Sequence, residues 1–211
     1  MYKGITITAH TGCEGTAMNS LEAIRKGAEC GADAVEFDVR FDGKQCVLSH
    51  DKQYSNPVTL KAALEEVKKY DGLMINVDLK EFNNVKEIIA ELEEAGVKER
   101  TVFTGAYSYN YLHIKKQLGD LPLYINAFPT LGSRFPFFAG LVAKRIKKIG
   151  AQGINTSKKF ASKCLVEAIR EEGLFFSVWT VKEKSEIKEF VGIKPDNITT
   201  KIPAAFKEDS K

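Results

Sequence analysis

Three acidic residues of the sequence are spaced so that they could bind a metal ion. Glu36 and Asp38 lie two positions apart in an apolar, β-branched run, and this spacing in a β-strand points both carboxylates to one face. Asp78 ends a second run of the same kind and can supply a third oxygen ligand. Carboxylates without clustered thiolates suit a hard divalent cation such as Mg²⁺ or Ca²⁺. The alternative is a structural network in which Arg40 and Lys80 neutralise these acids.

Two of the three histidines also end apolar runs. His10 follows residues 5–9 and His50 follows residues 45–49, so both rings can lie at one cleft. An imidazole, with its pKa near neutrality, can take a proton from a nucleophile and deliver one to a leaving group. Taken singly, each ring also fits an ordinary core histidine, and only their joint placement around the acids favours a catalytic pair. His113 lies in a helical pattern and is expected on the surface.

Lys80 and Trp179 complete the candidate residues. Lys80 follows Asp78 by two positions, so it faces the same side of its strand, where an ammonium group suits a phosphate oxygen. Simple charge balance for the acids is the alternative role of this lysine. Trp179 is the only tryptophan and ends another apolar run, where it is either a stacking surface for a ligand or part of the fold's wall.

A regular alternation of strands and helices would position these residues. Short β-branched runs alternate with stretches of helical period along the whole chain, which implies parallel strands with right-handed crossovers. Eight such strands predict an α/β fold, the (β/α)8 TIM barrel, with residues 1–211 forming one domain. An open, doubly wound sheet is the alternative. The expected strands are 5–9, 32–39, 73–79, 101–104, 121–126, 153–155, 174–180 and 197–200.

In the expected barrel, the candidate residues lie together at one end. A barrel of parallel strands has all its strand C-termini at one end, and the candidates lie at such ends. The turn Asp42-Gly43 and the run 45–49 predict a small hairpin extension after the second strand. Thr59 is expected to cap the helix that it begins. The expected helices are 19–30, 59–69, 85–95, 107–118, 138–149, 163–172 and 184–190.

Composition narrows the class of protein. The 211 residues are 44% hydrophobic and 28% charged, as in an average globular chain. A net charge of +3 gives no electrostatic reason to expect a nucleic-acid partner. No apolar run approaches the roughly 20 residues that span a bilayer, and no signal-peptide core follows Met1, so a cytoplasmic protein is expected. The four scattered cysteines fit reduced thiols better than a zinc site or disulfides.

Seven segments of the chain carry a resemblance to a known family. They are 7–12 (ITAHTG), 19–23 (NSLEA), 31–39 (GADAVEFDV), 47–51 (VLSHD), 76–80 (NVDLK), 178–181 (VWTV) and 195–200 (PDNITT). In this order and spacing they resemble the glycerophosphodiester phosphodiesterase family. The resemblance implies a TIM barrel that hydrolyses glycerophosphodiesters to glycerol 3-phosphate and an alcohol.

The resemblance also implies roles for individual residues. By position, His10 and His50 are similar to the family's acid/base pair, and Lys80 is similar to its phosphate-contacting lysine. The residues similar to its divalent-metal ligands are Glu36, Asp38 and Asp78. Trp179 and Thr11 are expected to contact the substrate. The implied chemistry is metal-assisted attack on phosphorus, with one histidine as base and the other as acid.

Several positions depart from the family pattern. Thr11 stands where the family has an arginine, so a bidentate phosphate donor is absent, and Met18 stands where it has a glutamate. The stretch between Asp51 and Asp78 is too short for the small insertion domain that many members carry there. We therefore expect a short form of the family with a wider cleft and a shifted choice of small-molecule phosphodiester.

Two further functions stay open at this stage. A phospholipase D-like lyase would form a cyclic phosphate from a lipid substrate, and it is favoured by the short insertion. A catalytically degenerate barrel would bind a phosphorylated ligand without turnover, and it is favoured by Thr11 and Met18. Against the second function, neither a histidine nor an acidic ligand of the pattern is lost.

An apolar segment follows the expected strand 121–126. Phe128 to Leu131 and Phe135 to Phe138 fall on the expected catalytic face, ahead of the cations Lys144, Arg145, Lys147 and Lys148. One interpretation is contact with an apolar alcohol or an anionic lipid surface. The favoured interpretation is a loop folded over the barrel mouth, since large exposed apolar patches are uncommon on monomers. Membrane contact is therefore not the favoured expectation, and the oligomeric state stays open.

Overall fold

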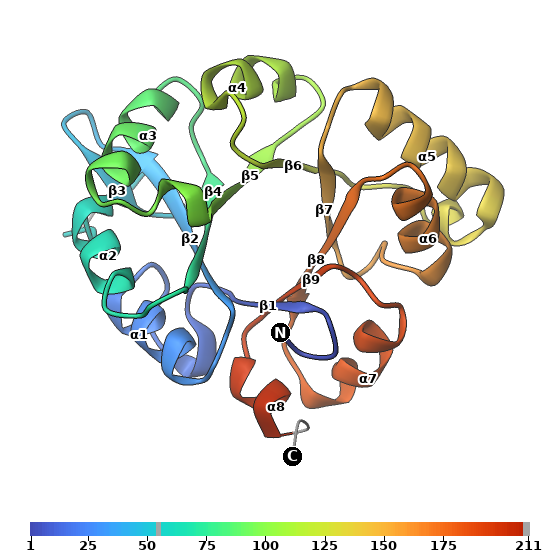
Figure 1. Ribbon diagram of the computed structural model, residues 1–211, viewed down its shortest axis with the longest axis horizontal. Helices are drawn as coiled ribbons and strands as arrows, with labels where there is room; N and C mark the ends of the chain where they lie inside the picture. The colour runs from blue at the N-terminus through green and yellow to red at the C-terminus, as the bar shows by residue number, and fades with distance from the viewer. Residues whose placement is uncertain (54–55, 209–211) are drawn as a thin grey trace.

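A closed ring of eight parallel strands forms the centre of the protein. The computed structural model describes residues 1–53 and 56–208. Around the ring the hydrogen-bonded order is β1-β9-β8-β7-β6-β5-β4-β2, and pairing of β1 with β2 closes it (Figure 1). The TIM barrel is confirmed and the open sheet is excluded. The strands of the ring are β1 (Thr6–Ala9), β2 (Ala34–Phe41), β4 (Met74–Leu79), β5 (Thr101–Ala106), β6 (Leu123–Asn126), β7 (Gly153–Ser157), β8 (Phe175–Val181) and β9 (Asn197–Thr200).

Helices follow the strands and cover the outside of the ring (Figure 1). Thr59 caps α2 as expected, because its side-chain oxygen accepts a hydrogen bond from the Ala62 N–H. The helices are α1 (Leu21–Glu29), α2 (Leu60–Val67), α3 (Val85–Glu94), α4 (Tyr111–Leu118), α5 (Pro136–Lys148), α6 (Lys163–Glu171), α7 (Lys184–Gly192) and α8 (Pro203–Glu208). Three short 3₁₀ helices accompany them: η1 (Cys13–Gly15), η2 (Lys98–Arg100) and η3 (Leu131–Arg134).

The predicted hairpin is present outside the ring. Strand β3 (Cys46–Leu48) pairs antiparallel with the end of β2. The Asp42 carboxylate accepts hydrogen bonds from the N–H groups of Lys44 and Gln45, which closes the turn. This hairpin carries the chain back toward the C-terminal end of the barrel, where His50 follows.

Strand β2 shows how the barrel separates apolar from ionisable side chains. Val35, Phe37 and Val39 are at most 1% exposed and belong to the apolar core, whereas the alternate positions Glu36 and Asp38 point to the barrel interior. Successive side chains of a strand face opposite ways, so alternate residues of β2 contribute to the apolar core and to the acidic cluster.

Several helix boundaries differ from the expected ones by up to four residues, and α8 was not expected; two of the differences have a clear physical cause. Helix α5 begins at Pro136, two residues early, because proline suits the first turn, where its missing N–H is not needed. Helix α4 begins at Tyr111 rather than at Tyr107, because the Asn110 side-chain oxygen accepts the Tyr107 N–H and forms a turn there.

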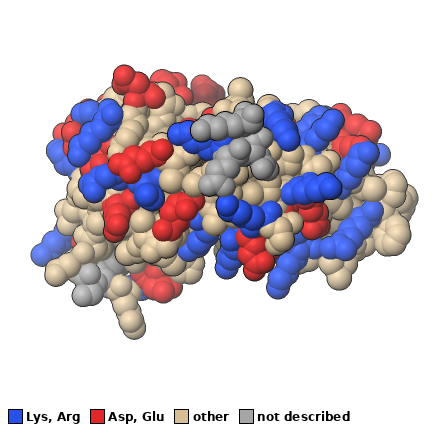
Figure 2. Space-filling model, turned by 90° about the horizontal axis from the view of Figure 1, so that it is seen from below, with Lys and Arg blue, Asp and Glu red and all other residues tan. Residues whose placement is uncertain are grey.

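The surface carries charges of both signs. On the face shown in Figure 2, basic and acidic side chains are interspersed over much of the molecule, which agrees with the small net charge. Among the described residues, no helix has the length and apolarity that a membrane span needs.

Candidate active site

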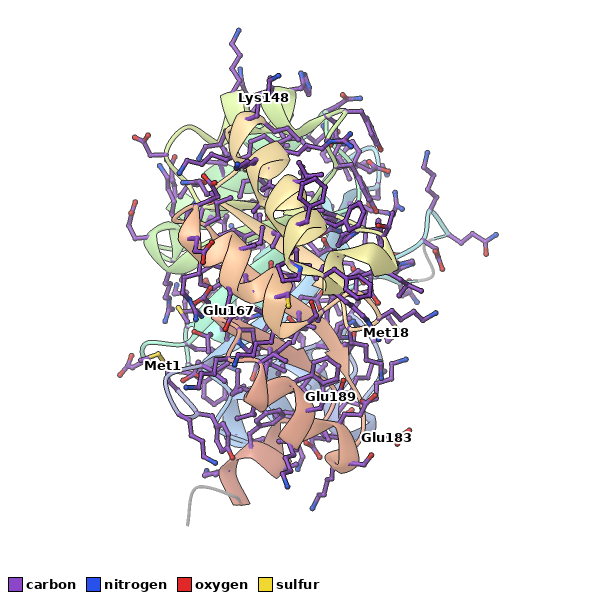
Figure 3. The ribbon with its side chains drawn as sticks, turned by 90° about the vertical axis from the view of Figure 1, so that its right-hand side faces the viewer. Met1, Met18, Lys148, Glu167, Glu183 and Glu189 are labelled. Atoms are coloured by element: carbon purple, nitrogen blue, oxygen red, sulfur yellow. The ribbon has the colours of Figure 1, made fainter. Side chains whose placement is uncertain are left out.

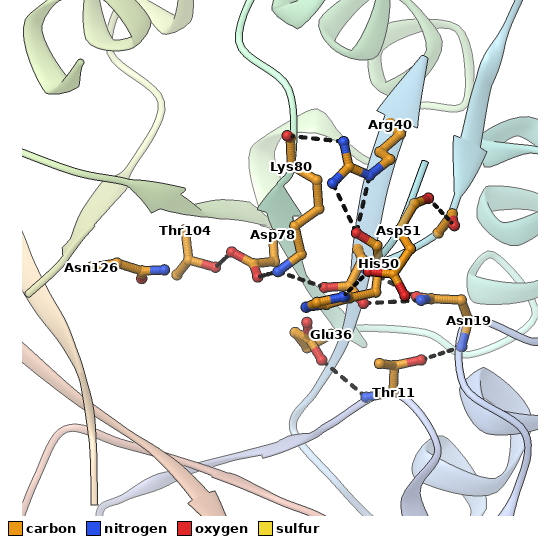
Figure 4. A network of polar contacts seen from close by, with 12 residues as sticks. Thr11, Asn19, Glu36, Arg40, His50, Asp51, Asp78, Lys80, Thr104 and Asn126 are labelled. Carbon is orange, nitrogen blue, oxygen red and sulfur yellow. Dashed lines mark hydrogen bonds and ion pairs between the residues drawn. The ribbon is translucent and has the colours of Figure 1, made fainter. Parts of the chain in front are cut away.

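A cavity of about 300 Å³ lies at the C-terminal ends of the barrel strands. Seven of the eight candidate residues line it together: His10, Glu36, Asp38, His50, Asp78, Lys80 and Trp179. Thr11 is not among the lining residues. Figure 4 shows the polar contacts that join most of this group.

The three acidic residues meet because of strand register. Asp38 of β2 pairs directly with Asp78 of β4, and Glu36 lies two positions before Asp38 on the same face. Ligand atoms of the three carboxylates all lie within 4.8 Å of one another. Burial, followed by the negative charges of Asp38 and Asp78, raises the pKa of Glu36 well above its usual range. The cluster is therefore short of positive charge.

Lys80 supplies part of that charge. Its Nζ lies 3.0 Å from Asp38 Oδ1 and 2.5 Å from Asp78 Oδ2. Burial alone would lower the pKa of this lysine, but the two carboxylates outweigh burial and raise it, so the ammonium stays charged. The salt-bridge network that the sequence offered as an alternative, with Lys80 and Arg40 as partners of the acids, is present for Lys80 but not for Arg40. Arg40 pairs with Glu81 instead, at 3.0 Å.

The donor set fits a hard divalent cation. Three carboxylates converge from two adjacent strands, and the bonded Lys80 ammonium shows that the cluster attracts positive charge. Oxygen ligands of this kind favour Mg²⁺ or Ca²⁺ over softer metals.

Asn19 holds one of these acids in place, and the sequence analysis assigned it no role. Its amide donates to Asp38 Oδ2 at 2.9 Å, and its side-chain oxygen accepts the Asp38 N–H at 3.0 Å. Asn19 has a left-handed backbone (φ 54°), which asparagine tolerates better than most residues. Asn19 belongs to the segment 19–23 that resembles the family, but only the structure shows its contact with Asp38.

Thr104 and Gly105 of β5 hold Asp78. The Thr104 hydroxyl lies 2.9 Å from Asp78 Oδ1. A Cβ at Gly105 would lie 2.2 Å from the Leu79 carbonyl oxygen, so only glycine lets β5 pass this close to β4. Neither residue stands out in the sequence, because a threonine and a glycine are ordinary residues of a strand and its turn.

His10 is oriented by its neighbour. Its Nδ1 lies 2.7 Å from the Thr11 carbonyl oxygen, so Nδ1 carries the proton and Nε2 has the free lone pair. Burial is the largest influence on this ring and lowers its pKa, while the Thr11 carbonyl acts in the opposite direction. A partly buried neutral imidazole with one free nitrogen suits proton abstraction.

His50 lines the same cavity but lies in a different environment. Its side chain is 58% exposed, and its Nδ1 lies 2.9 Å from a carboxylate oxygen of Asp51. The His50 carbonyl oxygen accepts two hydrogen bonds from the Arg40 guanidinium, at 3.0 and 2.9 Å. Figure 4 shows both contacts. An exposed ring exchanges protons readily with solvent.

Thr11 acts through its backbone rather than from the cavity wall. Its side chain is 3% exposed, and its hydroxyl accepts the Asn19 N–H. Its own N–H donates to Glu36 Oε2 at 2.9 Å, while its carbonyl orients His10. Met18, in contrast, is half exposed and lines the cavity.

An aromatic and neutral polar wall closes the cavity. The Trp179 ring lies edge to face with Phe128, with 6.3 Å between centroids, and Phe128 stacks on Tyr107 at 6.3 Å. Trp179 and Asn155 both line the cavity, and among the described residues their buried Nε1 and Oδ1 atoms have no hydrogen-bond partner. The sequence analysis missed the neutral lining residues Asn76, Thr104, Asn126, Asn155 and Thr199.

Cys13 and His113 lie away from this chemistry. Cys13 is fully buried, and burial raises its pKa to about 11, so it is an inert core thiol. All four cysteines are free, which confirms the expected absence of disulfides. His113 is exposed on α4, as expected.

Comparisons with known proteins agree with this fold. Residues 10–137 match the model of the glycerophosphoryl diester phosphodiesterase family. No curated protein matches the chain. Among solved structures, a Silicibacter pomeroyi protein provisionally assigned to this enzyme class has a TM-score of 0.83 at 16% identity, covering 97% of this chain and 92% of its own.

Two further structures have the same fold. A glycerophosphodiester phosphodiesterase from Parabacteroides distasonis has a TM-score of 0.75 at 18% identity, with 98% of this chain and 96% of that one covered. An Oleispira antarctica phosphodiesterase, solved in complex with the product sn-glycerol-3-phosphate, has a TM-score of 0.76 at 20% identity, with 96% and 95% covered. At these identities the likeness shows the fold.

The barrel and its acidic cavity define a TIM-barrel hydrolase of phosphoric diesters, and the family match includes every charged candidate residue of the cavity. The chain belongs to the glycerophosphoryl diester phosphodiesterase family.

Proposed function

We propose that this protein hydrolyses glycerophosphodiesters to glycerol 3-phosphate and an alcohol, with a divalent cation held by Glu36, Asp38 and Asp78. The observation that carries the proposal is the convergence of two histidines, three carboxylates and one lysine on a single cavity. The Oleispira antarctica relative, which was solved with the corresponding product, supports the choice of substrate class.

His10 acts as the general base in this proposal. Because the Thr11 carbonyl binds Nδ1–H, the free Nε2 is the atom that takes the proton of the attacking hydroxyl. Attack by water gives glycerol 3-phosphate directly, whereas attack by the substrate's own hydroxyl forms a cyclic phosphate, which a water molecule must then open. The ring is partly buried and lies 3.9 Å from Glu36, so the protonated form gains a negative neighbour.

His50 acts as the general acid. It lines the same cavity as His10, and the Asp51 carboxylate and the Arg40 guanidinium orient it. Its exposure lets it regain a proton from solvent after giving one to the leaving alkoxide.

The remaining residues bind the diester. The cation, when bound, supplies positive charge that neutralises the phosphate oxygens. Lys80 adds a second positive charge from the same side. Trp179 and Phe128 offer an aromatic wall for the leaving alcohol, and Asn126 and Asn155 add neutral polar groups to the cavity lining.

The first test measures release of glycerol 3-phosphate from glycerophosphocholine and glycerophosphoethanolamine, with Mg²⁺, with Ca²⁺ and after EDTA. We expect metal-dependent turnover and a loss of at least about 100-fold in His10→Ala and His50→Ala. His113→Ala is the matched control, because this exposed ring lies on α4 outside the cavity, and we expect it to retain full activity.

The outcomes separate the alternatives. A cyclic phosphate formed from a lipid diester would identify a lyase instead of a hydrolase. Binding of glycerol 3-phosphate without turnover of any diester would identify a degenerate barrel that only binds its ligand.

A further inference from the structure

Most of the exposed large apolar side chains of the described residues lie in one segment. Residues 128–141 contain six that are 50–71% exposed: Phe128, Leu131, Phe135, Phe137, Phe138 and Leu141. The sequence favoured a loop folded over the barrel mouth, but these side chains face solvent in the structure. We call this set the 128–141 patch.

The 128–141 patch lies on the catalytic side of the barrel. It follows the C-terminal end of β6 and includes η3 and the first turns of α5. In Figure 3, the start of α5 lies on the same side of the molecule as Met18, which lines the catalytic cavity, and Lys148 lies at the opposite end of α5. Phe128 belongs to both the patch and the cavity wall. The patch therefore reaches the mouth of the site.

The chain segment that carries the 128–141 patch is basic, although three of its lysines pair with acids of neighbouring elements: Lys147 with Glu172, Lys158 with Glu186 and Lys163 with Glu167. Residues 121–166 contain no Asp or Glu, although the chain as a whole has a net charge of only +3. Arg134 donates a hydrogen bond to the Lys159 carbonyl, which brings these two cations together beside η3. Neither has a carboxylate partner in residues 1–53 and 56–208. The cations of the stretch are Arg134, Lys144, Arg145, Lys147, Lys148, Lys158, Lys159 and Lys163.

We propose that the 128–141 patch docks the protein on an anionic phospholipid surface. Exposed aromatic rings beside lysine and arginine are the composition that enters the interface of a bilayer, where the rings reach the acyl boundary and the cations meet anionic headgroups. Docking in this way turns the cavity mouth toward the lipid.

Charge distinguishes a lipid surface from a second copy of the chain. A two-fold interface through the patch would place Arg134 and Lys159, which have no carboxylate partner among the described residues, on both sides, with cations opposite cations. An anionic surface instead neutralises them. In Figure 2, side chains that are neither acidic nor basic predominate at the right-hand end, the side on which α5 lies in Figure 1.

The experiment measures binding of the full chain to vesicles by co-sedimentation. Vesicles of phosphatidylcholine alone are compared with vesicles that also contain phosphatidylglycerol. We expect at least ten-fold stronger binding to the anionic vesicles, weakened by salt, because exposed charges are screened. Phe135→Ser with Phe137→Ser is expected to lower binding at least ten-fold. Both side chains are exposed, so the melting temperature should not change.

A charge-matched pair of variants tests whether the position of the cations matters. Arg134→Glu with Lys159→Glu reverses two charges beside the patch. Lys26→Glu with Lys86→Glu reverses two exposed charges on α1 and α3, on the other side of the ring (Figure 1). We expect the first pair to lower binding at least ten-fold and the second pair less than two-fold.

Three results would overturn the proposal. They are equal losses in the two charge pairs, unchanged binding after removal of Phe135 and Phe137, or no vesicle binding together with a dimer that these serines dissociate. Because the assay measures binding alone, its outcome does not depend on hydrolysis of glycerophosphodiesters.

Discussion

At the scale of single residues, Asn19 gives the most direct test of how the acidic cluster is held. Two hydrogen bonds join it to Asp38, one to the carboxylate and one from the backbone. Groups that orient a metal ligand typically affect metal affinity by about 10- to 100-fold. We expect Asn19→Ala to raise the half-saturating metal concentration by about that factor, measured by calorimetry with Mg²⁺ and Ca²⁺.

The control for this variant is Asn56→Ala. Asn56 also has a left-handed backbone (φ 48°), but it is exposed and is not one of the cavity residues. Alanine should be strained at both positions to a similar degree. If Asn56→Ala weakened metal binding as much as Asn19→Ala does, backbone strain rather than the Asp38 contact would be the cause.

The sequence predicted the charged residues of the cavity far better than the neutral ones. Glu36, Asp38 and Asp78 could be assigned because unpaired carboxylates at strand ends are costly and need an explanation. Asn155 and Thr104 carry no such signal, since neutral polar residues are common in strands. Thr11 was expected at the substrate, but its hydroxyl is used within the loop, and loop contacts cannot be read from spacing.

At the scale of elements, the β2–β3 hairpin positions His50 through Arg40. The guanidinium donates twice to the His50 carbonyl oxygen and pairs with Glu81. Lysine keeps the charge but cannot form the two-pronged contact. We expect Arg40→Lys to lower kcat about ten-fold with little change in KM or melting temperature, because only the proton donor is displaced.

A double-mutant cycle separates this positioning role from a general structural one. In the His50→Ala background, Arg40→Lys should cause no further loss, since both changes act on one proton transfer. Glu81→Gln is the matched control and should leave kcat intact, because the contact with the His50 carbonyl remains. Additive losses in the cycle would contradict the assignment.

Helices α1 and α2 are joined by a buried carboxylate whose contribution depends on pH. Glu66 of α2 is 4% exposed and accepts hydrogen bonds from Lys69 at 2.7 Å and from Arg25 of α1 at 3.2 Å. The Lys69 hydrogen bond is the largest influence and lowers the pKa of Glu66, and Arg25 acts in the same direction against burial. The folded protein therefore holds the Glu66 proton less tightly than the unfolded chain does.

The sign of the effect follows from this lowered pKa. The stabilisation is complete above the unfolded pKa of about 4.3 and is lost as pH falls through the folded value. We expect Glu66→Gln to reduce the free energy of unfolding by about 1 kcal/mol at pH 7, a figure kept small because both basic partners are largely exposed. In urea titrations the difference should shrink as the pH falls below the unfolded pKa of about 4.3 and vanish below the lowered folded value. Glu65→Gln, which removes an exposed pair with Lys68, should have no measurable effect.

At the scale of the whole molecule, the alternation of elements was enough to predict the barrel. Connections between parallel strands through a helix are right-handed, so eight strand–helix units in succession can close into a ring. The pairing of β1 with β2 shows this closure. Element ends were predicted less well, as at Tyr111 and Pro136, because side-chain turns and proline geometry shift them by a few residues. Strand register, which pairs Asp38 with Asp78, depends on the closed ring and cannot be read from one segment.

Repulsion among the carboxylates at the mouth of the barrel lowers the stability of the whole fold when no cation is bound. Glu36 is buried beside Asp38 and Asp78, and Lys80 offsets part of the repulsion among the three carboxylates. Replacing Glu36 with glutamine removes one charge but keeps an oxygen that accepts the Thr11 N–H. We therefore expect Glu36→Gln to melt at a higher temperature than the parent in EDTA, because less buried charge repels.

Addition of metal should reverse this order. A cation at about 100 times its dissociation constant stabilises the folded state that binds it by about 2.7 kcal/mol. The parent gains this stabilisation, whereas Glu36→Gln, with one ligand weakened, gains little, so the two melting curves should cross between EDTA and saturating Mg²⁺ or Ca²⁺. Lower stability of Glu36→Gln in EDTA would mean that the carboxylate supports the fold through its contact with Thr11. The acidic cluster would then be structural, as the salt-bridge alternative holds, and the proposed metal site would lose its main physical argument.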